Sequence, residues 1–420
     1  MTKNQLFRKG KWPIASIIFG VLLSNLSATA PADDPPTILI LDPENCILKS
    51  TNASIGERKF IANIFNPLPR KSLASSTIQV DELIGEGQYG RVYKAFANGQ
   101  CVAVKQPKKG KSVEREFKQA QNVVTAIYEA ARENRQYSKS TMPPGLMIQH
   151  FKSMTQRFKY IILPYYITSD GSLVERRVNG DNLYHIIKYG IEPYPNGEPN
   201  NNGEAIRRAV SFFMTLAVIH ALNIVCGDLN PGNIVIENNP SENHPCCFID
   251  WDMSQITGKP LWAGFLNQPE CLPPEYQEAS ERFLNYQKQL DKMRSECMII
   301  QTQLQNLCLE MDKKQELEAR RTILQQNAQA VQAHLESIRY PDAHPSFDIY
   351  RAISIFKLLL FGRSQQADMY EPPVSQRIDE ILKGMANPDP EQRLSAKKIA
   401  AKLQLIYFEY FVKRKTPCQA

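Results

Sequence analysis

The chain has 420 residues, of which 43% are hydrophobic and 22% are charged, and its formal net charge is +7. This composition excludes low-complexity and fibrous proteins, and the length suffices for one large domain with appendages. The positive charge suits anionic partners such as nucleotides. It is too small for this length to indicate nucleic-acid binding, so no nucleic-acid partner is expected.

The N-terminus and the cysteines give opposite indications about the compartment. Basic residues within positions 3–11 precede an apolar run over residues 14–23, and small residues follow up to Ala30. This layout predicts a signal peptide or membrane-targeting segment over residues 1–30, with membrane contact only through residues 12–27 if it is not cleaved. We therefore expect a secreted or exported protein, delivered into a host cell in one interpretation. The nine cysteines are scattered without zinc-type spacing, which favours a reducing compartment, so a cytoplasmic or membrane-anchored location is the alternative.

The remaining elements follow in chain order. Residues 31–77 are rich in Pro, Ser and Asn, and we interpret them as a linker or N-terminal extension. Periodicity and turn residues then predict strands over 78–85, 91–97 and 100–106, a helix over 113–135, a hairpin of strands over 160–168 and 172–178, and helices over 204–221, 347–361, 374–385 and 396–411. The fold class is therefore α+β, with a small β-rich lobe over residues 78–178 and a larger helical lobe over residues 179–411.

A long segment without Gly or Pro lies between Pro274 and Pro341. Its apolar residues repeat at heptad spacing over 283–311 and again over 317–338, which predicts a coiled-coil-like helical insertion over residues 276–340. A single helix of this length would extend roughly 100 Å at 1.5 Å per residue, so we expect a break near Asp312 and an antiparallel hairpin. Heptads do not name a partner. The insertion either binds a partner or is a solvated helical pair without one.

The turn between the first two strands reads Gly85-Glu86-Gly87-Gln88-Tyr89-Gly90. Between strands, this spacing indicates a flap over nucleotide phosphates, because glycines let backbone N–H groups approach phosphate oxygens. The motif alone also fits a plain Gly-rich hairpin. The third strand ends in Val102-Ala103-Val104-Lys105, and a lysine there needs a negative charge, which the phosphates of ATP can supply.

The strongest signal comes from residues 226–233, Cys-Gly-Asp-Leu-Asn-Pro-Gly-Asn, and from residues 248–252, Phe-Ile-Asp-Trp-Asp. In phosphoryl transfer the protein mainly positions groups and neutralises charge. Asp228 is suited to orient an acceptor hydroxyl and accept its proton. Asn233 and Asp250 offer the oxygen ligands that Mg²⁺ prefers. The competing interpretation is a turn followed by a capped strand.

Taken in order, these motifs resemble the eukaryotic-type Ser/Thr protein kinase family over residues 78–411. The resemblance implies a bilobal kinase fold, ATP and Mg²⁺ as cofactors, and a protein substrate. It implies a hinge over residues 173–180 with Val174 as gatekeeper. Asp348 resembles the helix carboxylate that holds the catalytic loop, and Glu275 with Arg393 resembles a late structural ion pair that favours a protein substrate.

The same resemblance implies the site residues. The catalytic set is Lys105, Asp228 and Asn230, and the metal ligands are Asn233 and Asp250. The cofactor-binding set is Gly85, Glu86, Gly87, Gln88, Tyr89, Gly90, Val92, Ala103, Lys105, Glu116, Val174, Glu175 and Arg177. Glu116 is the nearest acidic candidate to pair with Lys105, while Gln119 and Glu129 are the alternatives.

The chain departs from the family pattern around the catalytic motifs. Cys226-Gly227 replaces the usual His-Arg, so control through phosphorylation of Ser254 or Thr257 is doubtful. Asn230 replaces the usual lysine, which resembles small-molecule and atypical kinases. Asp252 is a third metal-site carboxylate in one interpretation and a solvent-facing strand end in the other.

Three functions are consistent with this pattern. The first is an ATP-dependent protein kinase that phosphorylates Ser or Thr hydroxyls. The second is a small-molecule or atypical kinase of the same fold. The third is a pseudokinase or scaffold that acts through the helical insertion.

Overall fold

The computed structural model describes residues 37–42, 47–52, 78–87, 89–97, 100–137, 157, 159–168, 170–238, 245–261, 272–305, 310–338, 341–364 and 369–413. The predictions for residues 1–30 and for Gln88 lie outside the described residues. Within the N-terminal extension, β1 (Thr37–Asp42) and β2 (Ile47–Asn52) form an antiparallel pair. Among the helices in the described ranges, none combines the length and apolarity required to cross a membrane.

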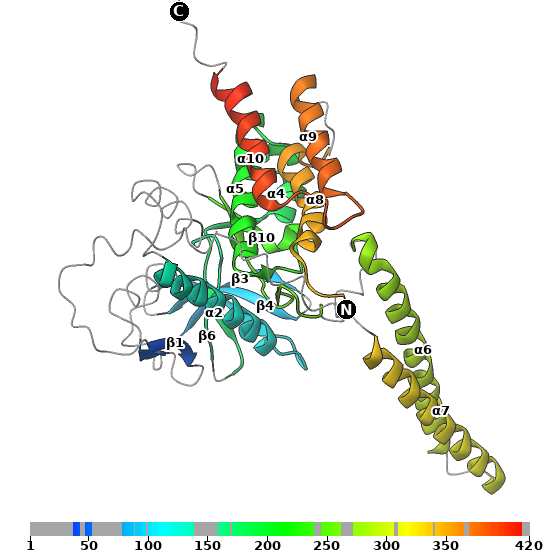
Figure 1. Ribbon diagram of the computed structural model, residues 1–420. Coiled ribbons are helices and arrows are strands. Elements are labelled where there is room, and N and C mark those ends of the chain that lie inside the picture. The colour runs from blue at the N-terminus through cyan, green and yellow to red at the C-terminus, as the bar shows by residue number, and fades with distance from the viewer. Residues whose placement is uncertain are drawn as a thin grey trace, which may run out of the picture.

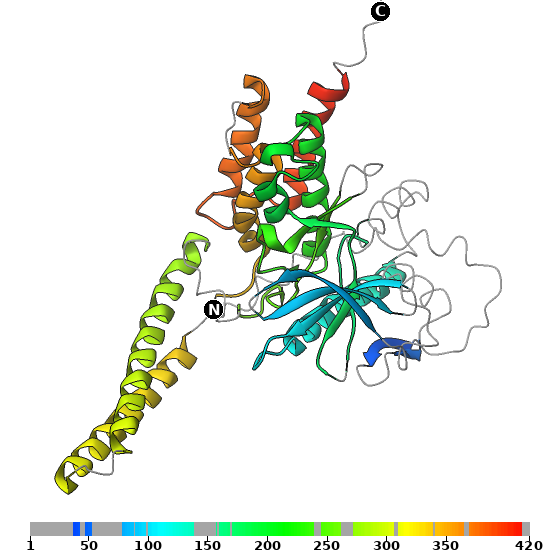
Figure 2. The same ribbon diagram turned by 180° about the vertical axis from the view of Figure 1, so that it is seen from behind.

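The small lobe is built on an antiparallel five-stranded sheet in the order β3-β4-β5-β7-β6. Its strands are β3 (Gln79–Glu86), β4 (Gly90–Ala97), β5 (Gln100–Pro107), β6 (Pro164–Ile167) and β7 (Leu173–Arg176). Because side chains alternate along a strand, Val102 and Val104 enter one apolar cluster while Ala103 and Lys105 lie on the opposite face. Helix α2 (Glu114–Tyr137) covers that opposite face, where Phe117 packs on Leu173 (Figures 1 and 2).

The large lobe is helical and is centred on α5 (Asn202–Ala221) and α8 (Pro345–Phe361). Phe212 of α5 stacks on Phe248, and Phe213 packs edge-on against Phe356 of α8. The other helical elements are α4 (Leu183–Tyr189), η4 (Pro195–Gly197), η5 (Pro231–Asn233), α9 (Pro372–Met385), α10 (Ala396–Tyr407) and η10 (Phe408–Val412).

Two small sheets position the loops that carry the motifs. One has the order β11-β10-β8, from β8 (Gly180–Asn182), β10 (Ile234–Glu237) and β11 (Cys246–Phe248); the other pairs β9 (Ile224–Val225) with β12 (Gln255–Ile256). Residues 226–230 follow β9 and residues 249–252 follow β11. The two motif loops therefore start from strands of different sheets, both of which lie against α5.

The predicted elements are present, with displaced ends. The strand expected over 160–168 begins only at Pro164, because the preceding residues bond to β11 instead: Ile162 N–H donates to Phe248 O at 2.9 Å, and Phe248 N–H donates to Tyr160 O at 2.8 Å. The last helix ends at Tyr407, and a π-helical turn continues the chain to Val412.

Helices α6 (Pro274–Leu304) and α7 (Met311–Ser337) form an antiparallel pair that projects away from both lobes (Figures 1 and 2). Tyr286 stacks on His334 near the base, and Arg321 donates to Gln301 toward the tip. The heptad residues form the contact between the helices; the buried ones are Phe283, Leu290, Ile300, Val331 and Leu335. The break precedes Asp312, and Met311, which the heptad places in the contact, is 71% exposed. That the pair is an insertion relative to a family stays a prediction.

Candidate active site

Lys105 joins three separate elements in one ion-pair cluster. From β5, its Nζ lies 2.6 Å from Glu116 Oε2 on the first turn of α2 and 3.2 Å from Asp250 Oδ2 on the loop after β11. Lys105 is 8% exposed and Glu116 is 3% exposed. Of the three candidates for this pairing, the structure brings Glu116 to Lys105, whereas Gln119 accepts a hydrogen bond from Asn122. The side chain of Glu129 lies outside the described residues.

The cluster carries more carboxyl groups than cations. Burial opposes the charge on Lys105, but Asp250, Glu116 and Glu175 together raise its pKa above the ordinary value, so the side chain stays an ammonium. Burial raises the pKa of Glu175 to about 7, although Lys105 acts in the opposite direction. The site therefore holds a permanent cation beside a carboxyl that titrates near neutral pH.

The structure corrects the assignment of Val174 as gatekeeper. Val174 lies opposite Val104 and is fully buried in the cluster on the far face of the sheet. Glu175 lies opposite Ala103, so it shares the face of Lys105. Strand alternation explains the error, because a shift of one residue moves a side chain to the other face. The residue of this strand that joins the Lys105 cluster is therefore Glu175, and the cluster is more acidic than the sequence indicates.

Asp348 fixes the start of the predicted catalytic loop, residues 226–233, through hydrogen bonds to its backbone. Its fully buried carboxylate accepts hydrogen bonds from Cys226 N–H at 2.7 Å and from Gly227 N–H at 2.9 Å, and His220 Nε2 lies 3.0 Å away. Gly227 has φ +79°, a conformation that favours glycine over the arginine usual in the family.

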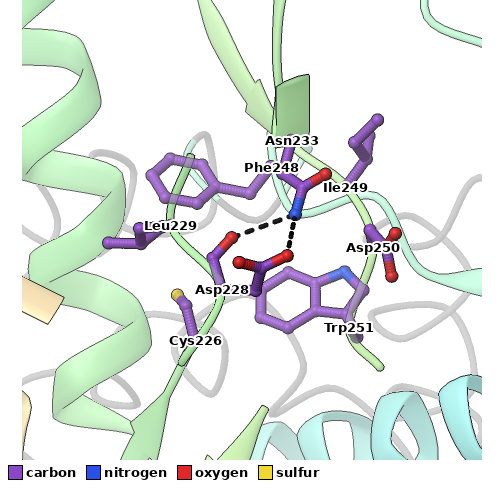
Figure 3. A pocket seen from close by; sticks show the side chains of 8 residues that line it. All are labelled: Cys226, Asp228, Leu229, Asn233, Phe248, Ile249, Asp250 and Trp251. Atoms are coloured by element: carbon purple, nitrogen blue, oxygen red, sulfur yellow. Dashed lines mark hydrogen bonds between the residues drawn. The ribbon is translucent and has the colours of Figure 1, made fainter. Parts of the chain in front are cut away.

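Asp228 is oriented by its own loop. Its Oδ2 accepts a hydrogen bond from Asn233 Nδ2 at 3.0 Å (Figure 3). It accepts another from Asn230 Nδ2, also at 3.0 Å. Asn230 also accepts from Gly232 N–H at 2.8 Å and caps η5. Asn230 thus shapes the loop, and as a neutral side chain it adds no positive charge.

The predicted metal ligands line one small cavity. It is bounded by Cys226, Asp228, Leu229, Asn233, Phe248, Ile249, Asp250 and Trp251 (Figure 3). The amide nitrogen of Asn233 is directed to Asp228, which leaves the amide oxygen pointing away from it (Figure 3). A neutral oxygen and a carboxylate suit Mg²⁺, which takes few protein ligands and completes its shell with water and phosphate. These residues fit the ion. Within the described ranges, no group of three or more His, Cys, Asp or Glu side chains offers another metal site.

Asp250 is held in an unusual backbone conformation. Its φ is +60°, in the left-handed region that few non-glycine residues adopt. The next residue, Trp251, is buried and donates from Nε1 to Ile162 O at 2.6 Å. The indole thus anchors the loop while the Asp250 carboxylate turns toward Lys105.

The Gly-rich turn lies between β3 and β4. Gly87 N–H donates to Gly90 O at 2.9 Å, and a Cβ on Gly90 would lie only 2.6 Å from Gln106 O. Glu86 forms ion pairs with Lys108 at 2.7 Å and Arg91 at 3.5 Å. These two cations therefore balance the negative charge of Glu86 at the turn where phosphates are expected.

The other predicted cofactor residues lie around the sheet. Val92 is the strand partner of Lys105 and shares its face. The Tyr89 ring contacts Lys111, whose Nζ lies 5.7 Å from the ring centre. Arg177 donates to Cys101 Sγ at 3.5 Å. Its side chain thus contacts β5, and any adenine contact of this hinge would come from its backbone.

Two ion pairs were not predicted from the sequence. Arg115 binds both carboxylate oxygens of Asp252, with Nε 2.7 Å from Oδ1. Asp252 is therefore not a solvent-facing strand end, and it does not line the cavity that holds Asn233 and Asp250. Its role as a third metal ligand stays a prediction. Arg351 of α8 reaches Asp228, with Nη2 3.1 Å from Oδ1. Its only sequence signal is a basic residue three positions after Asp348 on an apolar helix.

The late ion pair connects two distant segments of the large lobe. Arg393 Nη1 and Nη2 lie 2.5 Å and 2.6 Å from the two oxygens of Glu275.

A sequence model of the protein kinase domain matches residues 78–404. The chain belongs to the protein kinase domain family. This match confirms the resemblance to protein kinases and supports the bilobal kinase fold.

A curated relative is also similar to this kinase domain. It is the serine/threonine-protein kinase mos of Gallus gallus, which is 26% identical over 218 residues. The similarity covers 47% of this chain and 55% of the relative, so the chain spans about half the length of the protein it matches.

Proposed function

We propose that this chain is an active protein kinase that transfers the γ-phosphate of Mg-ATP to Ser or Thr hydroxyls of protein substrates. The observation that carries the proposal is the convergence of Lys105, Glu116 and Asp250 in one cluster, from β5, α2 and the loop after β11. Glu116 and Asp250 lie 11 and 145 positions from Lys105 in the sequence. A scaffold without catalysis has no need to bring a buried lysine and a strained aspartate together.

Each residue has a proposed task in this reaction. Lys105, held by Glu116, binds the phosphates that precede the transferred one, and Asp250 with Asn233 would hold Mg²⁺. When bound, Mg²⁺ neutralises charge on the phosphates. Asp228 orients the acceptor hydroxyl and accepts its proton. The Gly-rich turn covers the nucleotide and excludes water.

The acceptor class is supported by two further observations. The Glu275–Arg393 pair is of the kind that favours a protein substrate, and the relative with similar sequence is named as a serine/threonine-protein kinase. Gly227 and Asn230 favour a small-molecule acceptor instead, so this function is the second candidate.

The test uses the full chain with γ-labelled ATP, a mixture of generic proteins and a set of small alcohols. We expect label on Ser and Thr of the proteins, and we expect Asp228→Ala to lower turnover by about 10²–10⁴-fold without unfolding the chain. Label on the alcohols alone would establish a small-molecule kinase. Nucleotide binding without transfer by the folded wild type would establish a pseudokinase. Transfer that is equal in Asp228→Ala would refute the proposed role of Asp228.

A further inference from the structure

Arg351 places a buried positive charge directly behind the catalytic loop. It lies on α8, whose neighbouring residues are mostly apolar, and only 7% of it is exposed. A buried cation is stable only where a negative partner and hydrogen bonds compensate its lost hydration. The geometry identifies that partner as Asp228, because Arg351 Nη2 lies 3.1 Å from Asp228 Oδ1.

Other contacts fix the guanidinium group in place. Arg351 Nε donates to Leu229 O at 3.4 Å, and its Cζ lies 5.8 Å from the Phe347 ring centre. The arginine therefore binds both the side chain of Asp228 and the backbone of the next residue. It connects α8, which also carries Asp348, to the loop at two points.

The contacts of Asp228 are divided between its two oxygens. Oδ1 faces Arg351, while Oδ2 accepts from Asn230 and Asn233. The Asp228 side chain is 31% exposed, so the carboxylate keeps an accessible edge while its orientation is fixed from both sides.

Arg351 also compensates for a lack of positive charge. Residues 226–233 include Asp228 but no lysine or arginine, so the loop itself carries no positive charge. Within the part of the chain that the structure describes, no other basic side chain pairs with Asp228. A phosphoryl group that approaches Asp228 brings more negative charge, so a cation at this point lowers the repulsion between them.

We infer that Arg351 is a positioning residue for phosphoryl transfer: from α8 it orients the Asp228 carboxylate and supplies the positive charge that residues 226–233 lack. The inference rests on the proposed function, because it requires Asp228 to accept the hydroxyl proton. Among the described residues, the contacts of Arg351 are with Asp228, Leu229 and Phe347, none of which is a predicted nucleotide-binding residue. Its loss should therefore slow transfer without weakening ATP binding.

The experiment compares Arg351→Ala, Arg351→Met and Arg351→Lys with wild type in the full chain. We expect kcat to fall about 10²-fold in the first two variants, as for a displaced catalytic group, with KM for ATP within about threefold of wild type. Arg351→Lys keeps a charge and should recover part of kcat. Guanidinium ion at low millimolar concentration should restore part of kcat in Arg351→Ala, because truncation leaves a cavity of its shape.

Arg363→Ala is the matched control. Arg363 also donates to backbone oxygens, those of Ile187 and Lys188, but these belong to α4 and not to the catalytic loop. We expect wild-type kcat in this variant and no response to guanidinium ion.

The outcomes separate this inference from the proposed function. Folded Arg351→Met with wild-type kcat would overturn the inference alone. A loss of kcat together with a higher KM for ATP and a lower Tm would also overturn the inference, if neither guanidinium ion nor the Arg351→Lys variant restored kcat. That result would indicate that Arg351 has a structural role only. Transfer by wild type that does not depend on Asp228 would overturn both.

Discussion

Glu175 is a buried carboxyl group whose ionisation should oppose folding. Its pKa is raised from 4.5 to about 7, chiefly by burial. Between these values the folded chain binds more protons than the unfolded chain, so the free energy of unfolding falls as pH rises from about 4.5 to 7. Above about pH 7 the full cost of ionising the buried Glu175 carboxyl opposes folding. Below about pH 4.5 that cost is absent.

We predict that Glu175→Gln removes this pH dependence. The amide cannot ionise, so the variant should be more stable than wild type by about 1–3 kcal/mol at pH 8, with a much smaller difference at pH 4.5. Urea unfolding at the two pH values, without nucleotide, measures the effect. An equal difference at both pH values would contradict the assignment.

The pair of Lys105 and Glu116 gives a second prediction for single residues. Lys105→Met should lower kcat/KM by at least about 10²-fold, because the buried ammonium is the charge presented to the phosphates. Glu116→Gln should raise KM for ATP by a smaller factor, since the amide can keep a contact but not the charge. Gln119→Ala is the control on the same helix and should behave as wild type. Steady-state assays at several ATP concentrations separate the two effects.

At the scale of elements, α2 is bound to the loop after β11 through two consecutive residues. Glu116 reaches Asp250 through Lys105, and Arg115 binds Asp252 directly. We predict that Arg115→Ala and Asp252→Ala each lower kcat about tenfold, by the loss of a hydrogen-bonded ion pair. The double variant Arg115→Asp/Asp252→Arg exchanges the two charges and should recover activity that is lost in each single variant, Arg115→Asp or Asp252→Arg. Failure of the exchange to recover activity would argue against direct pairing.

The loop after β11 also bears on whether phosphorylation controls the proposed activity. Ser254 is buried and donates from Oγ to Trp251 O at 2.8 Å. Gly227 offers no positive charge at the position where the family resemblance implies an arginine. We therefore expect Ser254→Ala and Thr257→Ala to retain wild-type kcat. Phosphatase treatment before the assay provides an independent check, because dephosphorylation at these two positions should change nothing.

Much of this arrangement could be predicted from local sequence. The strands, helices and motif loops follow from periodicity and from residues at fixed spacing, which act over short distances along the chain. The choice between Glu116 and Gln119 could not be made in this way. The rotation of α2 is set by Phe117 packing on Leu173, and these residues come from different elements.

The errors have similar causes. Val174 was assigned to the wrong face because a shift of one residue in a strand cannot be detected from composition. The partners of Arg115 and Arg351 lie 137 and 123 positions away in the sequence. Single-sequence patterns carry no information about such pairs. An arginine on an apolar helix indicates only that some partner must exist.

At the scale of the whole molecule, Glu275 and Arg393 connect the base of α6 to the loop before α10. Arg393 is 6% exposed, and it also donates to Asn387 O at 2.7 Å. We predict that Arg393→Ala lowers the free energy of unfolding by about 3–5 kcal/mol, because it leaves a carboxylate in a poorly solvated site. Arg294→Ala, in the exposed pair with Asp291 on α6, should change it by less than about 1 kcal/mol. Thermal unfolding of both variants makes the comparison.

The two bonds from α2 to the loop after β11 have a consequence for inhibitor design. A ligand that bound only after α2 had moved outward would have its measured affinity reduced by the rarity of that conformation. Here the outward movement would require the Arg115–Asp252 pair and the Lys105–Glu116 pair to separate together. Under the proposed function, compounds that bind the nucleotide site with the helix in place are therefore the better starting point for inhibitors.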